Sequence, residues 1–173
     1  MAGRRLPLIP VDKLSTEQRK VYDSIRGGPR AKLANFSGAA PGPLGGPFNM
    51  MLRSPGIGNI VQSLGGEIRF NSSLPAKLNE FAIIVTARYW TSQYEWHAHC
   101  RLAIEAGLDP AKAKDVAENR RPANMDAAEA AVYDFSHELH TKKSVSDENY
   151  QRDRKSTRLN SSHTDISRMP SSA

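Results

Sequence analysis

Residues 94–100 read Tyr94-Glu95-Trp96-His97-Ala98-His99-Cys100 and place a carboxylate and an imidazole four residues apart in an apolar, helix-compatible run. Residues four apart lie on one face of an α-helix, so Glu95 and His99 share a face. That face continues through three apolar residues, Leu102, Ala103 and Ala106. We therefore expect the pair to point toward packed interior or a pocket rather than toward open water.

Helix signals recur along the rest of the chain. Two capping pairs, Ser15 with Gln18 and Asp126 with Glu129, each precede a helical pattern of apolar residues. The patterns predict helices over about 15–26, 55–68, 75–90 and 92–106, and further helices that start near 110, 126 and 146. The Gly- and Pro-rich stretch 29–47 predicts an ordered loop. No strand alternation is present, so the predicted fold is all-α.

Composition indicates a single globular domain in a reducing compartment. The chain has 173 residues and a net charge of +6, and its basic residues are scattered without interleaved aromatic residues, which argues against a nucleic-acid partner. Its single cysteine, Cys100, excludes an intramolecular disulfide and suits the cytoplasm. No segment has the length of a signal peptide or a membrane span. We expect a cytoplasmic protein that binds no membrane.

Residues 153–173 resemble a translated sequencing-library adapter rather than natural protein. They read DRKSTRLNSSHTDISRMPSSA, which matches adapter codons on both sides of a three-residue index, Thr164-Asp165-Ile166. The segment holds four basic and two acidic residues, so without it the net charge falls from +6 to +4. It lacks apolar periodicity, and we expect it to be disordered or unpacked. The domain is therefore expected to span residues 1–152, with the natural chain truncated after about Arg152.

The Glu95 and His99 pair is the first candidate for chemistry. A carboxylate beside an imidazole holds the tautomer of the ring and raises its basicity, which makes His99 a candidate proton donor or acceptor. The alternative is an intrahelical polar pair that only stabilises the helix. His97 and His99 point to nearly opposite sides of a helix and cannot chelate one metal ion together. Glu80 could join Glu95 and His99 at a metal, but no strong ligand motif is present.

For the cysteine, the aromatic residues and His97 of this region, a structural role is the alternative to a functional one. Cys100 is expected to be a buried, inert thiol rather than a reactive one. Trp90, Tyr94 and Trp96 are typical core residues because aromatic side chains bury large areas. They are also candidates for the walls of a pocket, and we name Tyr94 and Trp96 as substrate-pocket residues. His97 lines up with Arg101 and is expected to be solvated.

Longer stretches resemble one known family of helical proteins. The resemblance rests on residues 74–88 (LPAKLNEFAIIVTAR), on Gln93-Tyr94-Glu95-Trp96-His97-Ala98-His99 and on Ala106-Gly107-Leu108. Segments 21–30 and 129–147 extend it over nearly all of residues 6–152. On these residues the chain resembles the carboxymuconolactone decarboxylase family, whose all-helical fold is shared with the alkyl hydroperoxidase D-like (AhpD-like) proteins. The resemblance implies an AhpD-like helical domain.

The peroxidase branch of these proteins is matched only in part. Its conserved glutamate and histidine correspond to Glu80 and His99. Its two cysteine positions hold Ser92 and Glu95 here, and the histidine between them is Tyr94. Peroxidase chemistry that forms a disulfide needs two thiols, so the resemblance gives little support for this activity in this chain.

The decarboxylase-like branch has Glu-x-x-x-His, which Glu95 and His99 match. The resemblance implies a lyase that decarboxylates a small lactone or keto acid, with His99 as proton donor, Glu95 as its orienting partner and Glu80 as a second acid or base. It implies a homo-oligomer, a trimer or a multiple of one. We expect no cofactor and no metal. Two other functions stay open: an AhpD-like oxidoreductase with peroxiredoxin activity, and a non-catalytic oligomeric binding protein.

Overall fold

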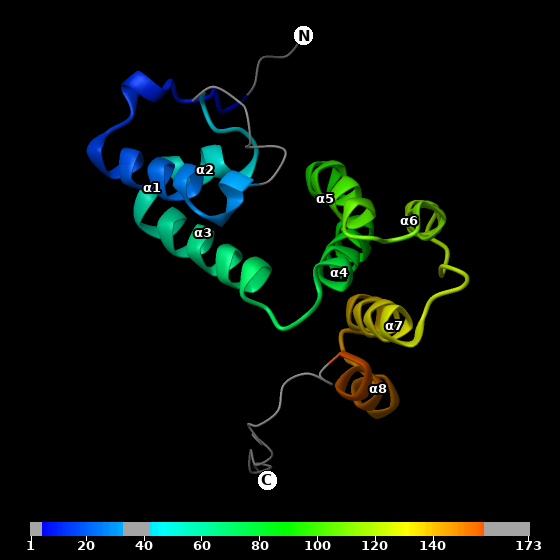
Figure 1. Cartoon of the computed structure of the whole chain (residues 1–173). Helices are drawn as coiled ribbons and strands as arrows, with labels where there is room; N and C mark the ends of the chain where they lie inside the picture. The colour runs from blue at the N-terminus through cyan, green and yellow to red at the C-terminus, as the bar shows by residue number, and fades with distance from the viewer. Residues whose placement is uncertain (1–4, 33–41, 158–173) are drawn as a thin grey trace, which may run out of the picture. The chain divides into compact units, whose positions relative to one another are not determined.

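The architecture is helical wherever the structure describes the chain. The structure is a computed structural model that describes residues 5–32 and 42–157. Within these residues the regular elements are α-helices and short 3-10 helices, and no strand is present (Figure 1). The prediction of an all-α fold is confirmed. No helix among these residues combines the length and the apolar character that crossing a membrane requires.

The chain divides into two compact units, Met1–Ser72 and Ser73–Ala173, called unit one and unit two below. Each unit has its own cluster of buried apolar residues. The expectation of one domain over residues 1–152 stays a prediction.

Unit one is built around helix α1. Its elements are η1 (Val11–Lys13), α1 (Thr16–Gly27), η2 (Pro29–Lys32), α2 (Pro47–Arg53) and α3 (Pro55–Phe70). The predicted capping box is present, because the side chain of Ser15 accepts from the backbone N–H of Gln18 and the side chain of Gln18 accepts from the backbone N–H of Ser15. The buried cluster comprises Val21, Tyr22, Ile25, Leu44 and Leu52.

The predicted loop over 29–47 contains one short helix and ends where a second one begins, and the sequence analysis predicted neither. Residues 29–32 form the 3-10 helix η2, and Pro47 opens α2. Proline suits the first position of a helix because its fixed φ is already helical and its missing N–H has no partner to lose there. The Gly and Pro composition hid a seven-residue helix, too short to show a clear apolar period. Residues 33–41 lie outside the described residues.

The face of α3 that packs within unit one is small and polar. Its buried residues are Gly58 and Gln62. A Cβ atom added at Gly58 would lie 2.1 Å from the backbone oxygen of Met51, so only glycine permits this close approach. Gln62 accepts from the buried guanidinium of Arg30 at its Oε1 (3.2 Å) and its backbone oxygen (2.9 Å). The apolar row that predicted this helix is instead 44 to 70% exposed; it comprises Ile57, Ile60, Val61, Leu64 and Ile68.

Unit two packs three long helices and two shorter ones. They are α4 (Ala76–Tyr89), α5 (Gln93–Glu105), α6 (Pro110–Ala117), α7 (Ala127–Lys142) and α8 (Asp147–Thr157). Helix α4 is central, because it packs against α5, α6 and α7. Phe81 and Ile84 of α4 are fully buried, and the ring of Phe81 stacks on Tyr133 of α7 at 6.2 Å between centroids. The predicted capping box of Asp126 and Glu129 opens α7.

Helix α8 continues past the predicted end of the natural domain at Arg152. Residues 153–157 form its last five residues, so they are helical rather than disordered, and the alternative of an unpacked segment stays a prediction. A proline-free polar run extends a helix that is already nucleated, even when it offers no apolar face. Residues 158–173 lie outside the described residues.

Glu138 ties α8 to α7. Its carboxylate accepts hydrogen bonds from Nζ of Lys142 (2.8 Å), from the backbone N and the Oγ of Ser146 (2.9 Å each) and from Nδ2 of Asn149 (2.7 Å). These donors, Lys142 first, lower the pKa of Glu138 from 4.5 to about 2. A carboxyl group whose pKa is lower in the folded state stabilises the fold above its unfolded pKa, and that contribution is lost as the pH falls toward the folded value.

We expect Glu138→Gln to lower the melting temperature at pH 7, and the difference from the wild type to shrink as the pH falls from 4.5 toward 2. The reason is that the wild-type carboxylate then becomes protonated and loses its ionic contacts. Circular dichroism melts at several pH values measure this. Glu105→Gln, at an exposed ion pair with Arg101, is the matched control and should change little. A loss that is the same at every pH would contradict the prediction.

Candidate active site

His99 lies between two carboxylates that come from two helices. Its Nδ1 is 2.7 Å from Oε2 of Glu80 on α4, and its Nε2 is 3.1 Å from Oε2 of Glu95, one turn earlier on α5. The spacing of four residues brings Glu95 to His99 within one helix. Glu80 reaches the ring only because α4 and α5 pack side by side. The structure brings the three predicted catalytic residues together, and their roles in catalysis stay predictions.

The three side chains differ in their access to solvent. The exposed fraction of the side chain falls from 40% for Glu95 to 12% for His99 and 8% for Glu80. Glu95 is therefore the outermost member of the cluster and Glu80 the innermost. A small molecule that approaches from solvent meets the carboxylate of Glu95 first.

The two contacts of His99 decide how protons are shared in the cluster. A neutral imidazole donates from one nitrogen and accepts at the other, whereas an ionised carboxylate only accepts. If Glu80 and Glu95 are both ionised, His99 must carry a proton on each nitrogen for both contacts to be favourable. If His99 is neutral, one of the two carboxyl groups must hold the proton. In both cases the two contacts hold two protons, one more than a neutral imidazole and two carboxylates carry together.

A cavity of about 380 Å³ lies beside Glu95. Its walls come mainly from α4 and the turn that follows; they are Ala82, Ile83, Thr86, Ala87, Trp90, Ser92 and Glu95. Among the described residues of this wall, Glu95 is the only ionisable one. The sequence reading missed the α4 residues because the apolar stripe of a helix has the same pattern whether it faces a core or a cavity.

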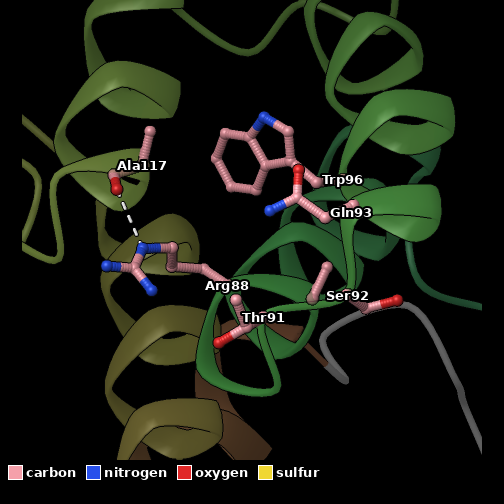
Figure 2. A pocket seen from close by; sticks show the side chains of 7 residues that line it. Arg88, Thr91, Ser92, Gln93, Trp96 and Ala117 are labelled. Atoms are coloured by element: carbon pink, nitrogen blue, oxygen red, sulfur yellow. Dashed lines mark hydrogen bonds between the residues drawn. The ribbon is translucent and has the colours of Figure 1, made fainter.

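Tyr94 and Trp96, the predicted pocket residues, do not line this cavity. Trp96 lines a neighbouring cavity of about 380 Å³ together with Arg88 and Gln93 (Figure 2), and it also packs against the core of unit two. Tyr94 is exposed and lines neither cavity. Successive residues of a helix point about 100° apart, so the chain neighbours of Glu95 face other sides. A part for them in substrate binding stays a prediction.

Neither His97 nor a group of metal ligands forms a further site in the described part of the chain. His97 is exposed, as expected, on the stripe where Nε of Arg101 lies 3.4 Å from Oε1 of Glu105. Within residues 5–32 and 42–157, no three side chains of His, Cys, Asp or Glu are grouped so that they could hold a metal ion.

Cys100 is partly buried against the core of unit two. Burial raises the pKa of its thiol, which lowers the fraction of the reactive thiolate near neutral pH. Its packing agrees with the expectation of an inert thiol.

We expect negligible thiol peroxidase activity, and Cys100→Ser should leave the rate of peroxide consumption unchanged. Reduction of a peroxide through an internal disulfide needs two thiols, and the sequence contains one. The measurement is peroxide consumption in the presence of a dithiol reductant, for the wild type and the variant. Turnover that disappears in the variant would place this chain in the peroxidase branch.

Comparison with known proteins identifies the region that holds the cluster. Residues 55–138 match the model of the carboxymuconolactone decarboxylase family, and this match spans α3 to most of α7, with Glu80, Glu95 and His99 inside it. No curated protein and no solved structure gave a significant match. Residues 55–138 of this chain are therefore similar to the carboxymuconolactone decarboxylase family.

Proposed function

We propose that this chain is a decarboxylase-like lyase that acts on a small lactone or keto acid by proton transfer. The observation that supports this proposal is the imidazole of His99 in contact with Glu80 at 2.7 Å and with Glu95 at 3.1 Å, beside a cavity of about 380 Å³ with mostly apolar walls. Carboxyl and imidazole groups that share a proton next to a cavity are suited to general acid–base catalysis.

The proposed reaction needs one proton and no electron acceptor. The bond between the substrate carbon and its carboxylate breaks, carbon dioxide leaves, and the electron pair stays on the substrate, where a conjugated carbonyl delocalises it. A proton then adds to the carbon, so that a carboxylate and a proton become carbon dioxide and a C–H bond. Apolar walls assist because they keep water away from the substrate while charge moves.

The exposure of the three side chains supports a division of roles that differs from the sequence expectation. The sequence reading named His99 as the proton donor. Because Glu95 is the outermost group and lines the cavity, we assign to it the delivery of the proton to the substrate. His99 then supplies the proton to Glu95, and Glu80 orients the ring from behind. We propose that protons move in this order, from Glu80 to His99 and from His99 to Glu95.

A substrate screen tests the proposal. The chain is incubated with a panel of small carboxylated lactones and keto acids, and release of carbon dioxide is measured for the wild type and for His99→Ala. We expect release from at least one compound by the wild type only. Saturable binding of these compounds without release would favour a non-catalytic binding protein, and equal release by both proteins would refute the proposed site.

We also propose that the chain self-associates. The five apolar residues of α3 that are exposed form a row along one helix at spacings of three, one, three and four. Exposed apolar patches of this kind are typical of interfaces between subunits. The expectation of a trimer, or of a multiple of trimers, came from the family resemblance.

We expect light scattering to give a mass that is a multiple of 19.1 kDa, and Leu64→Lys to lower it. A lysine at the centre of the row places a charge in the proposed interface, which is costly unless the charge is paired. Lys20→Glu, at an exposed position of α1, is the control for a change of charge. A wild-type chain that is monomeric at high concentration would contradict the proposal.

A further inference from the structure

A third cavity, of about 150 Å³, lies in unit two among α4, α7 and the end of α6. Its ionisable lining consists of Arg88, His137, His140, Tyr89 and Tyr133, and no carboxylate lines it. The neutral polar residues of its wall include Asn119 and Thr141. A volume of this size accommodates a compact ion and is smaller than the pockets that hold drug-sized ligands, which start at roughly 300 Å³. The cavity is therefore a candidate site for a small anion.

The two histidine rings are held in place by neighbouring side chains. Nε2 of His140 lies 2.9 Å from Oγ1 of Thr86, and the ring stacks on Tyr89 with 4.9 Å between centroids. The ring of His137 stacks on Tyr133 with 5.6 Å between centroids. Among the described residues, Nδ1 of His140 has no hydrogen-bond partner, so this nitrogen is available to a ligand.

Arg88 contributes a permanent charge to the same cavity. Its Nε donates to the backbone oxygen of Ala117 at 2.8 Å, which fixes the guanidinium at the C-terminal end of α6. Figure 2 shows the guanidinium turned toward Ala117 and away from Gln93 and Trp96. Its two terminal nitrogens make no hydrogen bond to the described part of the protein. A pair of nitrogens in this geometry matches two oxygens of an oxyanion.

The charged groups around His140 make its surroundings electropositive. The positive charges come from Arg88 of α4 and from Lys143, which follows the end of α7 with its Nζ 3.0 Å from the hydroxyl of Tyr89. The other ionisable groups of the wall are Tyr89 of α4 and His137 and Tyr133 of α7. Burial, and then Lys143 and His137, lower the pKa of His140. A bound anion would oppose these effects and raise that pKa.

The acidic residues on the neighbouring side of α7 are already paired. Asp134 binds Arg121 (2.9 Å) and Arg152 (2.7 Å). Glu138 accepts from Lys142 and from residues that precede or belong to α8. These carboxylates are therefore not placed to neutralise Arg88 and His140.

We propose that this cavity binds a compact oxyanion between the guanidinium of Arg88 and the protonated imidazole of His140. The ligand is tetrahedral, as in sulfate or phosphate, or it is a short carboxylate. The site is separate from Glu80, His99 and Glu95, and the proposal does not rest on the proposed lyase activity.

Anion binding to the whole chain tests this proposal. Sulfate is the first probe, because its charge does not change between pH 6 and pH 8, and acetate is the planar alternative; sodium chloride keeps the ionic strength constant. We expect saturable binding that is tighter at pH 6 than at pH 8, because an anion stabilises the protonated ring. In imidazole NMR titrations the anion should raise the pKa of His140, and the ring resonances of exposed His97 should not respond to the anion.

Variants locate the binding. His140→Gln should weaken binding at pH 6 by roughly tenfold and remove its pH dependence, because one charge-assisted hydrogen bond is lost. Arg88→Gln should weaken binding at both pH values, and His97→Gln is the matched control that should change nothing. Circular dichroism verifies the fold of each variant, and the NMR titration of the wild type stands if a variant does not fold. Binding of neither probe, equal affinity at the two pH values, or equal shifts of His97 and His140 would overturn the proposal.

Discussion

Replacing His99 by alanine is expected to lower the rate of decarboxylation by roughly a hundredfold or more, because a positioned acid–base group contributes about that factor. His99 touches both carboxylates of the cluster, at 2.7 Å and 3.1 Å, so its loss interrupts the proposed relay between them. The measurement is kcat and KM on a substrate identified by the screen. The effect should lie mainly in kcat, because the ring is not placed in the wall of the cavity beside Glu95.

His97→Ala is the matched control for this variant. His97 is exposed on the same helix, two residues away, and its replacement should leave kcat nearly unchanged. His99→Gln serves as a second variant, because glutamine keeps a polar group near the buried carboxyl of Glu80 and lowers the risk of unfolding. Equal sensitivity at the two histidines would rule out the assigned role of His99.

The second large effect is expected for Glu95→Gln, which should lower kcat by about a hundredfold and leave the melting temperature nearly unchanged. The amide of glutamine has nearly the shape of the carboxyl group but cannot carry the proton. The side chain of Glu95 is 40% exposed, so its replacement costs little free energy of folding. Circular dichroism melts and steady-state kinetics on the same preparations separate the two effects.

Glu80→Gln is the comparison that separates the members of the relay. Glu80 is buried and lies behind the ring, so its replacement should reduce both stability and kcat, with a smaller loss of kcat than Glu95→Gln. If Glu95→Gln retains full activity while Glu80→Gln and His99→Ala do not, then Glu95 is not the group that delivers the proton. The donor would then be His99, as the family resemblance implied.

The sequence predicted correctly those helices that begin with a capping box or show a clear apolar period. The capping boxes at Ser15 and Asp126 lie where helices α1 and α7 begin, because a capping box needs only residues three apart in the chain. Helix α2 was missed, because a seven-residue helix next to glycine and proline has no readable period. Periodicity also found α3 but did not show that its packed residues are Gly58 and Gln62.

The sequence by itself determined the all-helical fold and the contact between Glu95 and His99, because a helix places residues four apart on one face whatever surrounds it. The contact of Glu80 with His99 joins positions nineteen residues apart and depends on the packing of α4 against α5. Only the tertiary structure decided that contact, the order of exposure in the cluster and the walls of the cavities. Each of these depends on side chains from separate helices, and the angles at which helices pack are set by the shapes of the surfaces in contact rather than by any local run of residues.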